Sequence, residues 1–376
     1  MFQTTVKTPL DEQPLPALEL IEPNAYIMLP VQFSVGCPYT CEFCDIPMIY
    51  GRVARLKSPA RVLAELDQAH AAGFVGLILF VDDNLIANRK AFRKLLAEIQ
   101  GWQEQRHHPF ALTGEASVNI ARDEELLRAM QGARFTHLFL GVESPDAAVL
   151  EEISKKQNTL EPIVDSIRSI ERHGIEVILG IIFGFDGDTP KTGERMREFL
   201  HDANAPLVYF NLLAALPKTP LWDRMLREGR LLDTGEGDTR QSESLLACLT
   251  TNVRYRLDND LVVRMLLDTV AEVYSPREVY RRNLWNAEHV YGQQLPRRPT
   301  VRNLAELGFI LRFTLGALAR VLVGIGLRGE PEERREFWRF VAGVLRLRRA
   351  GKLASALEVL LRVPPNTHHL ITWGRT

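Results

Sequence analysis

The sequence predicts an α/β protein whose core is a partial (β/α)6 barrel of the TIM type, followed by a C-terminal helical extension. Two observations carry this prediction. Strand-like apolar runs alternate with helix-like segments between residues 31 and 213, which is typical of repeated βα units and a parallel sheet. The length before Gly235 holds six such units, whereas a closed barrel of this type needs eight.

Six strands are expected at apolar or β-rich stretches, each followed by a helix. The strands are expected at residues 31–35, 76–81, 110–116, 135–143, 175–185 and 207–213. The helices are expected at residues 58–72, 89–106, 123–131, from Pro145, and at 160–173 and 190–202. Ser58 is the expected N-cap of the first helix, because Pro59 suits its first turn.

Four segments are expected along the chain. Residues 1–30 form a linker-like segment, 31–232 the barrel, 233–300 a loop with a helical closing segment, and 301–376 an amphipathic helical region. Acids, glycines and serine over 231–242, and the prolines Pro296 and Pro299, mark the later joints. Apolar periodicity predicts helices over 258–273 and 304–327.

Composition limits the class of protein. Hydrophobic residues make up 46% and charged residues 25% of the 376 residues, so a disordered chain and a membrane channel are both disfavoured. The net charge of −1 gives no overall attraction to nucleic acid, and no such partner is expected. Four cysteines and an N-terminus without a secretion signal predict reduced thiols and a cytoplasmic location.

Three cysteines carry the clearest chemical signal. Cys37, Cys41 and Cys44 are separated by three residues and then by two, in a loop that follows the first expected strand. An iron–sulfur cube normally takes four cysteines, so three leave one iron open to a reactant. Packing of the three on one helical face is disfavoured by Gly36 and Pro38. The remaining cysteine, Cys248, is expected to be a small buried hydrophobic residue.

A structural zinc site is the alternative for these thiols. Such a site needs a fourth cysteine or histidine nearby, and the next histidine along the chain is His70. A zinc-binding or non-catalytic cluster module therefore stays as an alternative class of function.

Polar residues follow the expected strands, where the loops of a (β/α) barrel face a shared cleft. The candidates are Asp82, Asp83, Asn84, Glu115, Glu143, Ser144 and Asp186. A single acid at a strand end is often a solvated turn or a helix cap, so their joint placement is the signal. Gly180 and Gly184 lie within the most apolar strand, where glycine permits a flat ligand, or a helix, to approach the backbone closely.

The motifs together resemble the radical S-adenosylmethionine (SAM) enzymes, and within them the cobalamin-associated group that includes hopanoid C-2 methylase-like proteins. The resemblance covers about residues 14–228, and more loosely the helical tail. It implies a [4Fe–4S] cluster on Cys37, Cys41 and Cys44, with Phe43 near the adenine of SAM. It also implies SAM contacts from Glu143 and from one or more of Asp82, Asp83 and Asn84, and a backbone contact with the adenine along Gly180–Gly184.

One departure from that group concerns cobalamin. Its members usually carry a cobalamin domain before the cysteines, and residues 1–30 are too short to build one. The nearest approach to a cobalamin loop is Asp67–Gly73, which has one residue too many and is expected to be a helix C-terminus with His70 and Gly73 in ordinary ending positions.

The expected function is therefore reductive cleavage of SAM to a 5′-deoxyadenosyl radical, which abstracts hydrogen from a small or lipid-like metabolite. The alternative is a cobalamin-dependent C-methyltransferase that obtains cobalamin from elsewhere. The resemblance implies an electron donor such as flavodoxin or ferredoxin. Residues 320–352 hold nine Lys or Arg against four Glu, with three aromatic residues between them. This stretch is expected either to be a solvated helical cap or to lie on an anionic membrane surface.

Overall fold

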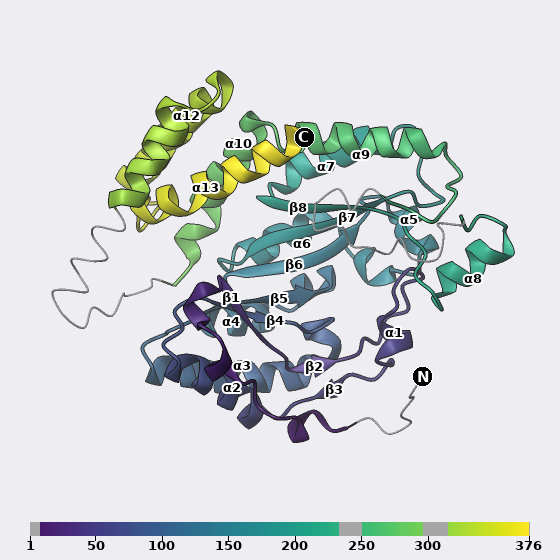
Figure 1. Cartoon of the computed structure of the whole chain (residues 1–376), viewed down its shortest axis with the longest axis horizontal. Coiled ribbons are helices and arrows are strands. Elements are labelled where there is room, and N and C mark those ends of the chain that lie inside the picture. The colour runs from purple at the N-terminus through teal and green to yellow at the C-terminus, as the bar shows by residue number, and fades with distance from the viewer. Residues whose placement is uncertain (1–7, 233–249, 296–314, 376) are drawn as a thin grey trace.

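The computed structural model describes residues 8–232, 250–295 and 315–375 (Figure 1). Its centre is a six-stranded, fully parallel sheet in the order β1-β4-β5-β6-β7-β8. The strands are β1 (Met28–Val31), β4 (Leu77–Phe80), β5 (Ala111–Ala116), β6 (His137–Glu143), β7 (Glu176–Phe183) and β8 (Leu207–Leu212). Strands β1 and β8 are the two edges, so the barrel is open, as the sequence predicts.

The first strand differs from its expected position. The sheet begins at Met28 rather than at Val31, and the expected strand 31–35 is divided. Its second part, β2 (Ser34–Val35), pairs in antiparallel fashion with β3 (Arg55–Leu56) in a separate two-stranded sheet. The cause is a distant carboxylate, because the backbone N–H groups of Phe33 and Ser34 both donate to the side chain of Asp82 instead of to a neighbouring strand.

Helices connect the strands and cover the outer face of the sheet (Figure 1). They are α1 (Ile46–Ile49), α2 (Pro59–Ala71), α3 (Arg89–Gln105), α4 (Glu124–Gly132), α5 (Ala147–Glu152), α6 (Ile163–Glu171), α7 (Thr192–Ala203) and α8 (Pro220–Arg227). Ser58 is the N-cap of α2, since its side chain accepts from the N–H of Arg61. Helix α2 ends just after His70, and Gly73 has a positive φ, so the expected helix C-terminus at Asp67–Gly73 is confirmed.

The two faces of the sheet differ in burial. Residues that point outward, such as Ile78, Leu138 and Leu179, are fully buried against the helices. Many residues at the alternate positions point inward and are only partly buried or exposed, among them Leu79, Phe139, Ile178, Ile182 and Tyr209. The inward face of the open barrel is therefore the face that remains available to a ligand.

The C-terminal part is helical. It contains α9 (Asn259–Val273), α10 (Pro276–His289), α12 (Pro331–Arg349) and α13 (Ala356–Arg375), and residues 315–327 are helical with a π-helical stretch at Leu322–Leu327. Helix α12 packs on α10 and α13 at the edge of the molecule (Figure 1). Cys248, the expected loop over 233–242, the joint at 296–299 and the start of the expected helix 304–327 lie outside the described residues.

Short 3-10 helices complete the described fold. They are η1 (Leu10–Glu12), η2 (Leu18–Leu20), η3 (Pro23–Ala25), η4 (Leu85–Asn88), η5 (Val118–Arg122), η6 (Lys156–Asn158) and η8 (Tyr291–Gln293). No helix within the described ranges is both long enough and apolar enough to cross a bilayer.

Candidate metal and cofactor site

The cysteine loop lies at the carboxyl end of the sheet, between β2 and α1. Cys37, Cys41 and Cys44 are free, partly buried thiols, and the N–H of Cys44 donates to the carbonyl of Cys41 at 3.2 Å. Gly36 begins the loop with φ of +100°, and a side chain there would meet the carbonyl oxygen of Gly51 at 2.9 Å. Glycine is therefore required at this turn.

Hydrogen-bond donors surround the three sulfurs. The N–H groups of Tyr39 and Ile46 donate to the sulfurs of Cys37 and Cys44. The amide of Gln157 lies 3.7 Å from the sulfur of Cys41, and that of Asn84 lies 4.0 Å from the sulfur of Cys37. Such donors stabilise sulfur that carries negative charge, and they tune iron–sulfur clusters in proteins.

Burial acts in the opposite direction on these thiols. It raises the pKa of Cys37, and it raises the pKa of Cys44 to about 11. Buried thiols that face donors fit a bound metal, because a metal holds cysteine as thiolate. Among the described residues, no three Cys, His, Asp or Glu side chains converge closely enough to hold one ion.

The acids after β4 are committed to the backbone of the cysteine loop. One oxygen of Asp82 accepts from the N–H of Phe33 at 3.0 Å, and the other accepts from Ser34. Asp83 accepts from the N–H of Gly36 at 2.8 Å. Burial raises the pKa of Asp82 to about 6 and also raises the pKa of Asp83. These carboxyl groups hold the chain that leads into Cys37.

Asn84 connects this loop to the next strand end. Its side-chain oxygen accepts from the N–H of Ile86 and caps η4, while its amide donates to Ser117 at 3.1 Å. Ser117 donates in turn to Asn119, whose amide donates to the hydroxyl of Tyr39 at 2.9 Å. This chain of hydrogen bonds begins beside the sulfur of Cys37 and returns to the cysteine loop.

Glu143 has an unusual backbone. Its φ is +67°, and the pairing of β6 with β7 shifts between Gly141 and Glu143. The carboxylate is ion-paired with Lys155, and both side chains are buried. The Lys155 ammonium lies 5.7 Å from the centre of the Phe43 ring, and that ring is 6.1 Å from the Phe185 ring. The bulge therefore brings Glu143 close to the aromatic residue between Cys41 and Cys44.

Glu115 and Ser144 occupy different surroundings. Ser144 is buried, and its hydroxyl accepts from the N–H of Asp146 at 3.2 Å. Glu115 lies at an inward position of β5 and is exposed, although the surrounding protein partly desolvates its carboxyl group. Burial raises its pKa, and the nearby Asp83 and Glu143 add to the effect. No hydrogen bond or ion pair engages Glu115 within the described part of the chain.

Aromatic rings pack against Gly180 in β7 and against Gly184, which directly follows β7. A side chain at Gly180 would meet the ring of Phe139 at 2.7 Å, and one at Gly184 would meet the ring of Tyr255 at 2.5 Å. Gly184 also has φ of +106°, and its N–H donates to Asp188 at 2.8 Å. A flat ring therefore lies close to the backbone at both glycines, and the ring belongs to Phe139 at Gly180 and to Tyr255 at Gly184.

Asp186, the acid that follows β7, belongs to an ion-pair network. It pairs with Arg224 and with Arg230, and these partners lower its pKa to about 2 in spite of burial. Arg224 also holds Glu42 through two hydrogen bonds of 2.6 and 3.0 Å. The N–H of Leu221 donates to the carbonyl of Glu42 at 3.0 Å. Helix α8 is thus attached to the cysteine loop at Glu42, the residue after Cys41.

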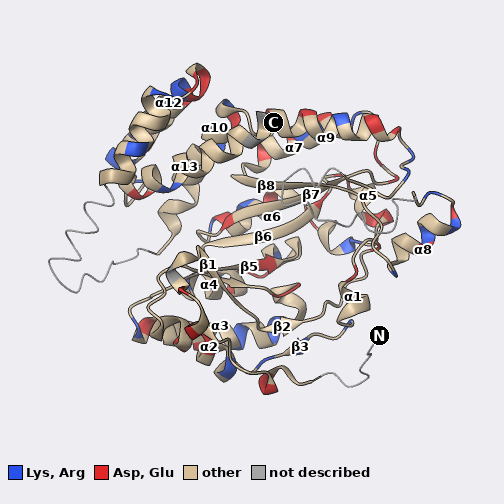
Figure 2. Ribbon diagram, viewed as in Figure 1, with Lys and Arg blue, Asp and Glu red and all other residues tan. Residues whose placement is uncertain are grey.

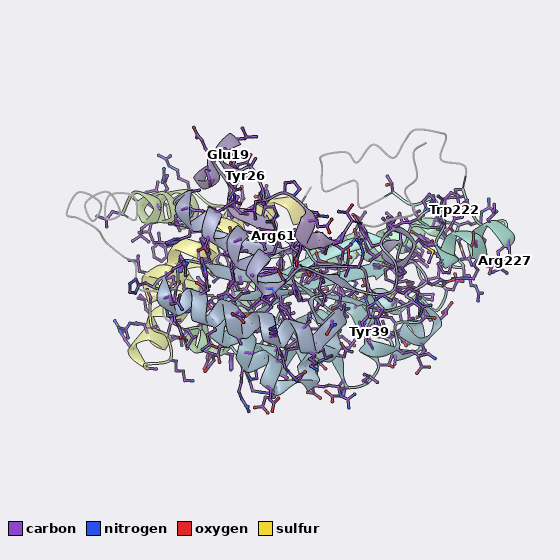
Figure 3. All side chains as sticks on the ribbon, turned by 90° about the horizontal axis from the view of Figure 1, so that it is seen from below. Glu19, Tyr26, Tyr39, Arg61, Trp222 and Arg227 are labelled. Atoms are coloured by element: carbon purple, nitrogen blue, oxygen red, sulfur yellow. The ribbon has the colours of Figure 1, made fainter. Side chains whose placement is uncertain are left out.

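The structure gathers the cysteine loop, Asp82, Asp83, Asn84 and Glu143 at one end of the sheet, together with α1, α5 and α8 (Figure 1). Tyr39 lies toward the same end as Trp222 and Arg227 of α8 (Figure 3). Sequence reasoning missed Lys155, Gln157, Asn119 and the pair Glu42–Arg224. None of these has a motif spacing, and only the position of Glu42 inside the cysteine motif offered a signal.

The fold and the cysteine loop define an enzyme of the radical SAM type. The radical SAM superfamily matches residues 31–200, and a domain of unknown function, DUF4070, matches residues 219–375. The chain belongs to the radical SAM superfamily, whose cofactors are a [4Fe–4S] cluster and SAM.

Two relatives are similar over most of the chain. The hopanoid C-2 methylase of Rhodopseudomonas palustris is 40% identical over 100% of this chain and 67% of the relative. An uncharacterized methyltransferase of Synechocystis is 37% identical over 89% of this chain and 59% of the relative. The chain thus spans about three fifths to two thirds of the length of these relatives.

Solved structures share the fold. The radical SAM methyltransferase TsrM from Kitasatospora setae, with cobalamin and a [4Fe–4S] cluster bound, matches with a TM-score of 0.52 at 17% identity, over 86% of this chain and 61% of that one. The cobalamin-dependent radical SAM enzyme OxsB matches with a TM-score of 0.51 at 15% identity, over 93% and 53% of the two chains.

Proposed function

We propose that this enzyme is a radical SAM C-methyltransferase that acts on an apolar, lipid-like substrate with the help of cobalamin. Sequence reasoning placed hydrogen abstraction without methyl transfer first, and the methylase and methyltransferase relatives shift that order. The observation that carries the proposal is the position of three donor-surrounded thiols at the mouth of an open barrel whose inward face is largely apolar.

Cys37, Cys41 and Cys44 would hold the cluster, and one iron would stay without a protein ligand. When bound and reduced, the cluster and SAM supply a 5′-deoxyadenosyl radical for hydrogen abstraction. The chain's own residues bind, orient and exclude water. Asp82 and Asp83 would keep the loop in shape rather than contact SAM, because both oxygens of Asp82 and one oxygen of Asp83 accept from the backbone N–H groups of residues 33, 34 and 36.

The remaining predicted contacts form the proposed SAM site. Phe43 would pack near the adenine, beside Lys155 and Phe185. Glu143 and Ser144 lie at the bulged end of β6, and Glu115 lies on the neighbouring strand β5. Glu115 suits the amino group of SAM, because an unengaged carboxylate among other acids attracts a cation. Gly180 and Gly184 would place the backbone of β7, with Phe139 and Tyr255, along the ligand.

The inward face of the sheet indicates the substrate class. Its partly exposed side chains are mostly hydrocarbon, and the Phe139 and Tyr209 rings lie 6.0 Å apart. The apolar members are Met28, Leu77, Leu79, Phe139, Ile178, Ile182, Leu207 and Tyr209. An apolar lining with few polar groups favours a large hydrocarbon ligand such as a hopanoid, the substrate class that names the Rhodopseudomonas relative.

The test is an anaerobic reaction with SAM, a hopanoid and a reduced flavodoxin or ferredoxin, with and without added cobalamin. Methyl transfer predicts a product heavier by one methylene unit only when cobalamin is present, and predicts a deuterated methyl group from methyl-labelled SAM. Formation of 5′-deoxyadenosine with an altered but unmethylated lipid would support the hydrogen-abstraction alternative. SAM that stays intact in a cluster-loaded enzyme under reducing conditions would refute both.

The ligand assignment has a separate test. Cys41→Ala should abolish the visible absorbance of the reconstituted cluster, because one of the three proposed iron ligands is lost. Far-UV circular dichroism should stay unchanged, since Cys41 is in a loop outside the sheet. An unchanged iron content in this variant would contradict the assignment, and zinc in place of iron and sulfide would favour the metal-module alternative.

A further inference from the structure

Helix α12 has a face that stays exposed and that the other described elements touch only where Trp338 meets Gly326. Its residues follow helical spacing along one side, and they are Arg335, Trp338, Arg339, Ala342, Leu345, Arg346 and Arg349. The opposite side, with Phe337, Phe340 and Val344, is buried against α10 and α13. The buried side of the helix is therefore apolar, and its exposed side carries both basic and apolar residues.

On and around α12 the basic side chains are exposed, whereas half of the acidic side chains are buried. Eight basic residues over 328–352 are exposed, against two exposed acids, Glu330 and Glu332. The other two acids are buried, where Glu333 pairs with His368 at 2.7 Å and Glu336 accepts from Arg335 and Arg339. Within the described residues, Arg346, Arg348 and Arg349 have no ion-pair partner. Figure 2 shows the resulting basic segments along the helix.

Apolar side chains are interleaved with these arginines. Trp338 is 44% exposed, Leu345 is 43% exposed, and Leu327, just before the helix, is 63% exposed. The indole N–H of Trp338 donates to the carbonyl of Gly326 at 2.9 Å, which leaves hydrocarbon as the exposed part of its ring. Trp338 and Leu345 are seven residues apart and therefore share one side of the helix.

We propose that this face, defined by Leu327 and the seven outer residues of α12, docks on a bilayer that contains anionic lipids. Tryptophan and leucine would enter the boundary between headgroups and acyl chains, and the arginines would extend their charged ends to the lipid phosphates. An acidic protein or nucleic acid would use the arginines but would gain little from the exposed leucines. The apolar stripe therefore favours lipid.

This proposal does not depend on the substrate of the enzyme. Helix α12 lies at the end of the molecule away from the cysteine loop (Figure 1). The face would anchor the enzyme to the surface and would leave the cluster site free of the bilayer. Failure of one proposal therefore leaves the other intact.

Flotation of the full chain with vesicles tests the docking. The protein should float with phosphatidylcholine vesicles that contain phosphatidylglycerol, and should stay in the soluble fraction with phosphatidylcholine alone. Replacement of both Arg346 and Arg349 by glutamine should weaken binding about thirty-fold, at about 1 kcal/mol for each lost cation. The matched control changes Arg128 and Arg264 to glutamine, because these are exposed arginines on α4 and α9.

A second pair of variants separates lipid from other polyanions. Trp338→Ala and Leu345→Ala should each weaken vesicle binding several-fold while heparin binding stays unchanged, since only the bilayer takes up apolar side chains. Thermal melts of both variants serve to show that they fold. If the full chain stayed in the soluble fraction when mixed with anionic vesicles at low salt, the proposal would be overturned. Vesicle binding that is unchanged in both Trp338→Ala and Leu345→Ala would also overturn it, and would favour an acidic macromolecule as the partner of the arginines.

Discussion

At the scale of single residues, buried carboxylates shape the cysteine loop. Asp82 is 1% exposed, and its two oxygens satisfy the N–H groups of Phe33 and Ser34. A buried N–H without an acceptor costs about 1–3 kcal/mol, so one side chain here determines the conformation of two neighbouring residues. Those residues also set the direction in which the chain leaves β1.

Asp82→Ala should therefore lower the free energy of unfolding by about 2–4 kcal/mol, because it leaves two buried donors without a partner. Urea titration followed by circular dichroism measures this loss. Asp83→Ala is the matched comparison, since it removes only one hydrogen bond at a half-buried site, and should cost about 1 kcal/mol. Equal losses in the two variants would contradict this account.

Residues also show what sequence could and could not reveal. The spacing of Cys37, Cys41 and Cys44 is local, so the sequence alone predicts the loop and suggests a cluster on it. The partners of these cysteines lie elsewhere in the chain, because Gln157 is 116 residues from Cys41 and Asn84 is 47 residues from Cys37. No local spacing encodes such a pair, and sequence reasoning could not find it.

At the scale of elements, hydrophobic periodicity predicted most strands and helices, because each element buries one side. The first strand is the exception. The stretch 31–35 is rich in strand-forming residues, yet the N–H groups of Phe33 and Ser34 donate to Asp82, which is 49 and 48 residues away in sequence. The sequence signal at Gly180 was also ambiguous. A glycine makes room for a ring in the same way whether that ring belongs to a ligand or to Phe139.

Helix α6 contains a carboxyl group that makes stability depend on pH. Burial raises the pKa of Glu171 to about 8, although Arg168 donates to one of its oxygens at 3.1 Å. Its other oxygen is buried without a hydrogen-bond partner in the described structure. The folded state therefore holds a proton that the unfolded state releases near pH 4.5, and stability from this group falls as pH rises toward 8.

Glu171→Gln should remove that dependence. The variant should match the natural protein near pH 5 and should be more stable by about 1–3 kcal/mol at pH 9, where the natural side chain must be buried as an anion. Thermal or urea unfolding at several pH values measures the difference. Glu161→Gln, at an exposed position, provides the control. A difference that does not change between pH 5 and pH 9 would refute the role of this proton.

At the scale of the whole molecule, two family segments meet at the cysteine loop. Arg224 lies in the DUF4070 region, and it binds Glu42 of the radical SAM region on one side and Asp186 on the other. The side chain of Asp186 is 1% exposed, so its negative charge is stabilised by its ion pairs with Arg224 and Arg230. The second segment therefore contributes directly to the support of the cluster site.

Arg224→Ala should destabilise the protein by about 2–3 kcal/mol, because Glu42 loses its paired guanidinium while Asp186 keeps Arg230. It should also speed the loss of iron to a chelator from the reconstituted enzyme about ten-fold. Arg227→Ala is the control, since Arg227 is exposed on the same helix (Figure 3). Arg224→Lys should recover charge but not the paired geometry, and should give an intermediate rate.

The grip of Arg224 on Glu42 joins residues that are 182 positions apart. During synthesis, the thiols leave the ribosome long before the helix that will fasten them. Until α8 has been made and has docked, Glu42 lacks its cationic partner. The last brace of the cysteine loop is therefore also the last of its hydrogen-bonding partners to be translated, after Asp82, Asp83 and Gln157.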